Sequence, residues 1–354
     1  MKLNGNEAFV QKQQATMGAL VERYIETERL RDVKALRPGE ALIEGAVQFS
    51  TACSYLTTLD RYIKPYWNDV PLIDVKPAAV DEWLRGLTKP PKRGDVENTN
   101  VRTSPLSPKT RGHIKAMMYR LMEKAMFWEL VPLARNPIGL VEVKGISKRR
   151  RKPFILTVEQ FHSVLQQFPE PYRQMVQVAM CLGLRVSEIL ALKWPDFDFD
   201  GLTLRVVRGV VHRRVGDVKT DYSEDELPLD ADFAELMLNW RKKCPKSDGG
   251  WVFPNPNTGE PYHASTIQQD YIRAAGRKTK LPRDIGWHTF RHTYRSFLDD
   301  AGAPVGVQQK LMRHAQVSTT MNTYGNAQMN SKRQANTKVV RMVSPAREGV
   351  SVAI

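Results

Sequence analysis

Five consecutive basic residues interrupt this 354-residue chain near its middle, and Pro153 follows them. The run has no apolar side chain that a core could bury, so we expect it to be extended and solvated. Because the chain is also longer than one typical domain, the sequence predicts two folding units joined by a linker over 146–153. A charged surface loop is the alternative. The basic residues are Lys148, Arg149, Arg150, Arg151 and Lys152.

Before the basic run, apolar residues recur at helical spacing. The spacing predicts helices over 17–30, 50–66 and 77–87, and the Pro-, Asn- and Thr-containing stretch 88–108 is predicted to be a loop. Ser107 before Pro108 is typical of a helix N-cap with proline in the first turn, and the following helix carries a methionine-rich face. These patterns predict an all-helical domain over 16–145, preceded by a tail over 1–15.

After the basic run the pattern is mixed. Thr157 and Gln160 have the spacing of a capping box. Short β-type runs predict strands at 202–207, 210–218 and 227–229. We therefore expect an α+β, mostly helical domain with a small antiparallel sheet over 154–330, followed by a tail over 331–354. Further helices are predicted at 172–180, 186–192, 233–241, 264–279, 290–300, 305–312 and 319–324.

The net charge is +15, from 53 Lys and Arg against 38 Asp and Glu. Such an excess indicates a polyanionic partner, with nucleic acid first among the candidates, because each neutralised phosphate releases a counterion. The alternative is a basic protein without such a partner. No apolar run is long enough to span a membrane, and no secretory signal opens the chain. Three widely spaced cysteines indicate buried, reduced thiols and a cytoplasmic location, and no Cys/His spacing indicates a metal site.

Four residues near the C-terminus carry groups suited to phosphodiester chemistry: His288, Arg291, His314 and Tyr324. Without a metal, such chemistry needs cations on the non-bridging oxygens, a nucleophile and an acid for the leaving oxygen. An arginine fork pairs two phosphate oxygens and stays charged. His288 and Arg291, spaced i, i+3, are predicted to share one side of a helix start, and the neighbouring His292 is predicted to support that helix.

A second arginine, Arg185, interrupts an apolar run after Gly183, where a surface charge is unexpected. We expect Arg185 and Arg291 each to open a helix after a turn, beside backbone N–H groups that favour an anion. Glu188 follows Arg185 by one turn and is placed to orient it. Tyr324 needs a neighbouring base and positive charge to attack, since the pKa of a free phenol is near 10. Taken singly, each of these residues could be an ordinary surface or packing residue.

Three blocks of the sequence resemble the tyrosine recombinase, or phage integrase, family over about residues 16–330. They are 183–192 with Arg185, the His-x-x-Arg box 288–293, and the segment from Leu311-Met312-Arg313-His314 to Tyr324. Lys219 fits the position of the family's hairpin lysine. The N-terminal segment 62–66 with Trp67 is similar to the family's core-binding domain, which implies a SAM-like helical fold.

The resemblance implies a role for each matching residue. Tyr324 would attack the scissile phosphate to give a 3′-phosphotyrosyl link, and Lys219 would protonate the departing 5′-oxygen. Arg185 and Arg291 would stabilise the pentavalent state. His288 would accept the tyrosine proton and His314 would hydrogen-bond the phosphate. Glu188 would hold the first arginine block in place.

One departure stands beside the final histidine, where the family commonly has Leu-Gly-His and this chain has Met312-Arg313-His314. Arg313 replaces the glycine. It is predicted either to alter the local backbone or to contact DNA phosphate, as are the linker residues 148–152.

The sequence therefore predicts a site-specific DNA recombinase that integrates or excises a phage or other mobile element. We expect double-stranded DNA as partner and a homotetramer on paired sites, monomeric or dimeric off DNA, with accessory DNA-bending or directionality proteins as possible partners. No cofactor is expected, and the location is cytoplasmic, associated with the nucleoid of a bacterial host. The alternatives are a type IB topoisomerase-like nicking-closing enzyme and a catalytically silent DNA-binding protein on the same fold.

Overall fold

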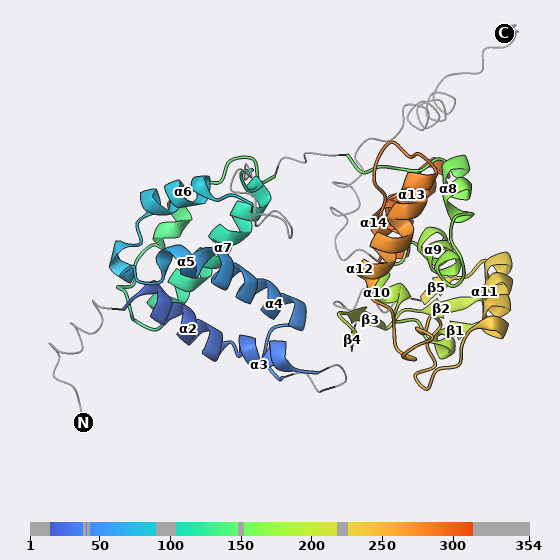
Figure 1. Cartoon of the computed structure of the whole chain (residues 1–354), viewed down its shortest axis with the longest axis horizontal. Coiled ribbons are helices and arrows are strands. Elements are labelled where there is room, and N and C mark those ends of the chain that lie inside the picture. The colour runs from blue at the N-terminus through green and yellow to red at the C-terminus, as the bar shows by residue number, and fades with distance from the viewer. Residues whose placement is uncertain are drawn as a thin grey trace, which may run out of the picture. The chain divides into compact units, whose positions relative to one another are not determined.

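The chain divides into two compact units, Met1–Arg151 and Lys152–Ile354 (Figure 1). The structure is a computed structural model. It describes residues 15–37, 40, 43–89, 104–147, 152–217 and 226–313, and the side chain of Asp217 is not among them. Within these ranges no helix is long and apolar enough to cross a membrane.

In the described part of the N-terminal unit, every labelled secondary-structure element is a helix. Side-chain caps begin three of its helices: the Thr16 hydroxyl accepts from the Ala19 N–H at 3.3 Å, the Ser107 hydroxyl from the Thr110 N–H at 3.1 Å, and the Asn136 side-chain oxygen from the Ile138 N–H at 3.0 Å. The helices are α2 (Met17–Thr27), α3 (Leu30–Ala35), α4 (Phe49–Thr58), η1 (Leu59–Ile63), α5 (Lys64–Trp67), η2 (Leu72–Asp74), α6 (Pro77–Gly86), α7 (Pro108–Phe127) and η3 (Pro137–Leu140). Their apolar faces form a single core that includes Leu20, Tyr24, Ile63, Trp67 and Met118.

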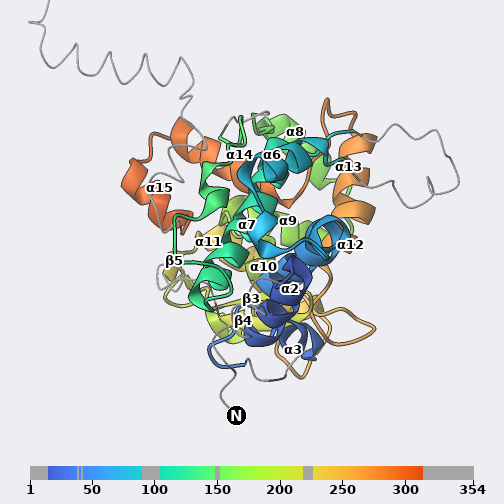
Figure 2. The same ribbon diagram turned by 90° about the vertical axis from the view of Figure 1, so that its left-hand side faces the viewer.

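The C-terminal unit combines helices with short strands. Helix α14 packs along α9, and the two can be followed side by side in Figure 1. Figure 2 shows α15 after α14 in the same unit. The helices are α8 (Val158–Leu165), α9 (Tyr172–Cys181), α10 (Val186–Ile189), η4 (Trp194–Asp196), α11 (Ala231–Lys243), α12 (Ala264–Ile267), η6 (Gln268–Ile272), α13 (Arg273–Lys278), α14 (Trp287–Asp300) and α15 (Val305–Leu311).

Two small antiparallel sheets lie in this unit. The three-stranded sheet has the order β1 (Phe197–Asp198), β2 (Thr203–Arg205), β5 (Glu226–Pro228), and the second sheet pairs β3 (Arg208–Val211) with β4 (Arg214–Asp217). In the first sheet Leu204 lies opposite both Phe197 and Leu227, and all three side chains are buried. This register is the one that places one apolar face on the core.

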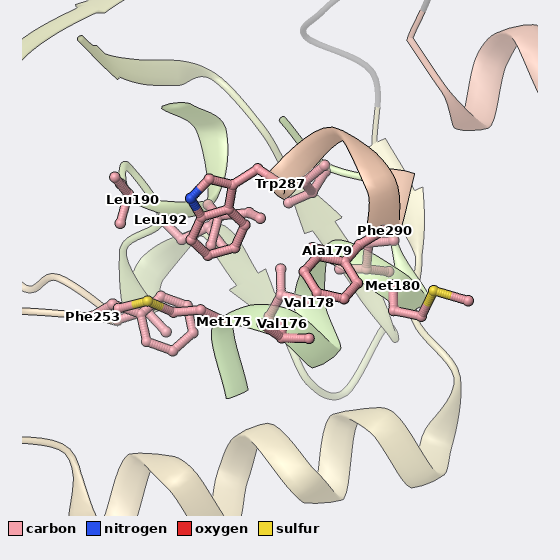
Figure 3. Close-up of a cluster of buried hydrophobic side chains, with 14 of the residues drawn as sticks. Met175, Val176, Val178, Ala179, Met180, Leu190, Leu192, Phe253, Trp287 and Phe290 are labelled. Carbon is pink, nitrogen blue, oxygen red and sulfur yellow. The ribbon is translucent and has the colours of Figure 1, made fainter. Parts of the chain in front are cut away.

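The core of the C-terminal unit lies between α9, α14 and the strands. Figure 3 shows Trp287 and Phe290 of α14 among residues of α9, including Met175 and Val178. Both aromatic residues are buried, and the Trp287 indole N–H donates to the Ala264 carbonyl at 3.2 Å. Because Trp287 and Phe290 anchor the first turn of α14 in the core, they also fix where His288 and Arg291 lie.

The fold that the sequence predicts is confirmed in its coarse form, a mostly helical chain with small antiparallel sheets. The Thr157–Gln160 capping box is present, with bonds of 3.0 and 3.2 Å. The expected buried thiols are wrong, because Cys181 is exposed and Cys53 and Cys244 are half-buried. The three thiols are free. The helix predicted at 319–324 lies outside the described residues.

Adjacent residues of α11 provide a matched test of this core. Met237 is fully buried and Leu238 is 36% exposed. We expect Met237→Ala to lower the free energy of unfolding by about 2–5 kcal/mol, because it removes buried methylenes and leaves a cavity. Leu238→Ala should change it by less than about 1 kcal/mol. Urea denaturation followed by tryptophan fluorescence measures both, and equal losses would contradict the assigned face of α11.

Candidate active site

The first arginine block begins at a tight turn after α9. Gly183 has φ +61°, in the left-handed region that favours glycine. A Cβ at Gly183 would clash with the Tyr294 ring of α14 and would lie 3.3 Å from the Met312 sulfur. The turn brings Arg185 to the N-cap of α10, as predicted, with its side chain partly exposed to solvent.

Glu188 orients Arg185 through two contacts. Its carboxylate accepts from the Arg185 backbone N–H at 2.7 Å and from the Arg185 guanidinium at 2.8 Å. Glu188 is 4% exposed. Burial alone would raise the pKa of Glu188, but the positive charges of Arg313, Arg185 and Arg291 outweigh it and hold that pKa below its usual value. Glu188 is therefore ionised at neutral pH, and the orienting role predicted for it has a geometric basis.

Arg291 lies in α14, in the turn after His288, and not at the first helical residue as the sequence analysis expected. Its side chain is buried, and its guanidinium donates to two backbone carbonyls, those of Gly183 and Met312. These bonds join the turn after α9 to the C-terminal end of α15. Burial and the nearby Arg185 lower the pKa of Arg291 below the ordinary arginine value, and the group stays protonated at neutral pH.

Arg313 differs from its predicted position. We expected Arg313 either to alter the local backbone or to contact DNA phosphate, but the side chain has no exposed area and its guanidinium pairs with the Glu188 carboxylate. Its backbone has φ +47°, in the left-handed region that favours glycine. The Arg313 carbonyl accepts from the Arg185 guanidinium at 3.3 Å.

His288 lies in the first turn of α14, one turn before Arg291, as the i, i+3 spacing predicted. Partial burial lowers the pKa of His288 below 6.5, and the charges of Arg291 and Arg185 lower it further. The imidazole is therefore neutral at neutral pH and can accept a proton. The half-buried His292 ring lies 6.1 Å from the His288 ring, centroid to centroid, in an edge-on arrangement.

Several predicted site residues lie outside the described residues. These are Lys219, His314, Tyr324 and the linker residues Lys148, Arg149, Arg150 and Arg151. Lys152 is described and exposed, and its carbonyl accepts from the Arg283 guanidinium at 3.3 Å. The described part of the chain holds no cluster of His, Cys, Asp and Glu suited to a metal ion.

Two contributors to this site were not predicted from the sequence. Tyr294 packs against the turn at Gly183, and the Met312 carbonyl accepts from Arg291. Tyr294 lies one helical turn after Arg291, so its spacing placed it on the same face of α14. No sequence signal identifies a backbone carbonyl as an acceptor.

The described site carries a net positive charge. Three guanidinium groups, those of Arg185, Arg291 and Arg313, surround one carboxylate, that of Glu188, which leaves two positive charges around the neutral His288. Such a cluster in a partly buried position suits an anion with several oxygens, such as a phosphate diester.

Comparison with known proteins agrees with this geometry. Residues 155–331 match the phage integrase family. A tyrosine recombinase of Pseudothermotoga lettingae is 25% identical over 255 residues, which cover 72% of this chain and 79% of that protein. A putative prophage phiRv2 integrase of Mycobacterium tuberculosis is 23% identical over 282 residues, covering 77% and 69%.

Solved structures share the fold. The Tn1549 transposon integrase in complex with a circular intermediate DNA has a TM-score of 0.70 at 18% identity, covering 92% of this chain and 99% of that one. A lambda integrase dimer bound to a COC′ core site has a TM-score of 0.64 at 16% identity, covering 91% and 81%. The chain belongs to the phage integrase family of tyrosine recombinases. It is a site-specific DNA recombinase, and its enzymatic class is DNA strand transferase.

Gly183→Ala tests the turn that carries Arg185. A left-handed φ costs a non-glycine residue roughly 1–2 kcal/mol, and the new Cβ also meets the Tyr294 ring. We expect a lower thermal midpoint and slower DNA cleavage. The double variant Gly183→Ala/Tyr294→Ala should recover only part of the cleavage rate, because the backbone strain persists. Gly216→Ala in β4, where a Cβ meets nothing within 4 Å, is the control.

The lowered pKa of His288 can be measured directly. In the DNA-free protein we expect its imidazole protons, assigned by comparison with His288→Asn, to titrate by NMR below pH 6.5. Since the folded state binds the proton more weakly than the unfolded chain, this histidine lowers stability as pH falls below 6.5. Titration at or above pH 6.5 would contradict the burial and charge assigned to the site.

Proposed function

We propose that this recombinase cuts and rejoins DNA strands through a 3′-phosphotyrosyl intermediate, with Arg185 and Arg291 binding the scissile phosphate. The main support for the proposal is the contact between the two arginine blocks. Arg291 donates to the Gly183 carbonyl, two residues before Arg185, although the bonded residues are 108 positions apart in sequence. Arg185 follows this turn and Arg291 of α14 is bonded to it, so two guanidinium groups supply the cations that phosphoryl transfer needs.

The proposed roles follow the chemistry of each group. The Tyr324 hydroxyl attacks phosphorus, and its proton passes to the neutral His288. The bond from phosphorus to the 5′-oxygen breaks as Lys219 protonates that oxygen, and His314 hydrogen-bonds the phosphate. Attack by a 5′-hydroxyl on the phosphotyrosine reverses these steps and rejoins the strand. Because each step exchanges one phosphoester bond for another, no nucleotide cofactor is needed as an energy source, and no metal ion is assigned a role.

The substrate and assembly are proposed from similar proteins. The Tn1549 and lambda integrase structures contain DNA, and one lambda integrase structure is a tetramer on a Holliday junction. We propose that this chain also binds double-stranded DNA and acts as a tetramer on paired sites, with a SAM-like N-terminal domain over 16–145 and the catalytic domain over 154–330. The basic residues 148–152 then cross the phosphate backbone between them, and the protein works at the host nucleoid.

The natural reaction is proposed to be integration or excision of a mobile element. Similarity to a prophage integrase and a transposon integrase supports this direction. A topoisomerase-like enzyme would relax supercoiled plasmids that lack a target site. We therefore expect plasmid recombination to require two target sites, and relaxation of a plasmid without any site to be absent. DNA flanking the gene supplies the candidate sites.

Tyr324→Phe tests the nucleophile. On a nicked suicide substrate carrying the target site, we expect the wild-type protein to accumulate a covalent protein–DNA adduct and the variant to form none. DNA affinity should be nearly unchanged, because only one hydroxyl is lost. Tyr119→Phe removes a hydroxyl from an exposed residue of α7 in the N-terminal unit and serves as the matched control. An adduct that persists in Tyr324→Phe would refute the assignment.

A further inference from the structure

We propose that Arg313 is a positioning residue, which holds the Glu188 carboxylate so that Glu188 presents Arg185 to the phosphate. The inference rests on the function proposed above and adds a residue to that site. It replaces the earlier expectation that Arg313 contacts DNA phosphate.

The contacts form a closed ring of three residues. One Glu188 oxygen accepts from the Arg185 guanidinium at 2.8 Å, and the other accepts from the Arg313 guanidinium and from the Arg185 backbone N–H. The Arg313 carbonyl then accepts from the Arg185 guanidinium at 3.3 Å. Arg313 therefore restrains Arg185 twice, through its side chain by way of Glu188 and through its own backbone.

Burial excludes Arg313 from the DNA surface. Its side chain has no exposed area, whereas that of Arg185 is 38% exposed. A phosphate can therefore reach Arg185 but not Arg313 without rearrangement. The guanidinium of Arg313 acts through Glu188, which is itself only 4% exposed.

Stability alone does not account for an arginine at this position. The backbone has φ +47°, where glycine is free of strain. Two of the three guanidinium nitrogens of Arg313, Nε and one Nη, have no hydrogen-bond partner in the part of the chain that the structure describes. A buried ion pair as a whole is weak evidence for stability, because the cost of burying both charges offsets much of their attraction. The contact with Glu188 is the described interaction that only the side chain provides.

The shared carboxylate explains what the side chain does. Without Arg313, the second Glu188 oxygen would be held only by the Arg185 backbone N–H, and the carboxylate could turn toward the Arg185 guanidinium and draw it inward. With Arg313 also on the second oxygen, the carboxylate is held from a second side, and the Arg185 guanidinium keeps its remaining N–H groups for a ligand. The extra cation also raises the positive potential at the phosphate position.

Arg313→Gly separates this role from folding. The substitution removes the side chain and keeps a residue suited to φ +47°. On the suicide substrate we expect the single-turnover cleavage rate to fall about 100-fold, since small misplacements of catalytic groups have effects of that order. Loss of one partner of a buried ion pair also lowers stability, so the cleavage rates are compared at a temperature where both proteins are folded. Arg313→Lys keeps a cation for Glu188 and should recover part of the lost rate.

DNA affinity supplies the second readout. The slope of log affinity against log salt should be unchanged in Arg313→Gly, whereas loss of a phosphate contact lowers it by about one. Lys310→Gln, which removes an exposed cation from the same helix end, controls for charge and should leave the cleavage rate unchanged. In the background of Glu188→Gln, adding Arg313→Gly should cause little further loss, because Arg313 acts through Glu188.

The outcomes distinguish the inference from the function on which it rests. Three outcomes would overturn the positioning role, provided that the wild-type protein cleaves DNA. The first is a wild-type cleavage rate in Arg313→Gly, and the second is a lowered salt slope in that variant. The third is a loss of cleavage rate in the double variant equal to the full sum of the losses in Arg313→Gly and Glu188→Gln. If Arg313→Gly fails to fold, Arg313→Lys tests the positioning role in its place. A stable Arg313→Lys variant that cleaves DNA no faster than Glu188→Gln also overturns the positioning role. Failure of the wild type to form an adduct would instead count against the proposed function.

Discussion

The site depends on one buried carboxylate. Glu188 has three positively charged neighbours, and its ionisation at low exposure is possible only because those charges outweigh the cost of burial. In return it fixes both the backbone and the guanidinium of Arg185. Without that carboxylate, Arg185, Arg291 and Arg313 would repel one another within a small volume, and the turn after α9 would lose the charge that holds it together.

Arg291 connects this electrostatic cluster to the fold. Its guanidinium bonds to the carbonyls of Gly183 and Met312, so α14 is tied both to the turn after α9 and to the end of α15. The same helix is anchored in the core by Trp287 and Phe290 (Figure 3). Packing in the core and the position of Arg291, which we propose binds phosphate, are thus set by one helix, and a shift of α14 would move both.

Much of this architecture could be predicted from the sequence, because its local signals agree with its tertiary contacts. Helical spacing, the caps at Ser107 and Thr157 and the short β-type runs led to the correct coarse fold. The pairing of His288 with Arg291 on one side of α14 follows from helical geometry alone. Cysteine burial failed as a prediction, because Cys181 lies at the end of α9 in an apolar run yet faces outward, and composition does not reveal which side of a helix end is covered.

What the sequence by itself determined is the kind of chemistry: an arginine block, a His-x-x-Arg box, a histidine and a tyrosine in family order, in a basic chain. Only the tertiary structure decided which of the described site residues contact one another. Arg313 was expected at the DNA and instead lies in the interior beside Glu188, 125 positions away in sequence. The physical reason is that a lone arginine carries no sign of its partner. Whether its charge meets solvent, DNA or a buried carboxylate depends on which distant segment folds against it.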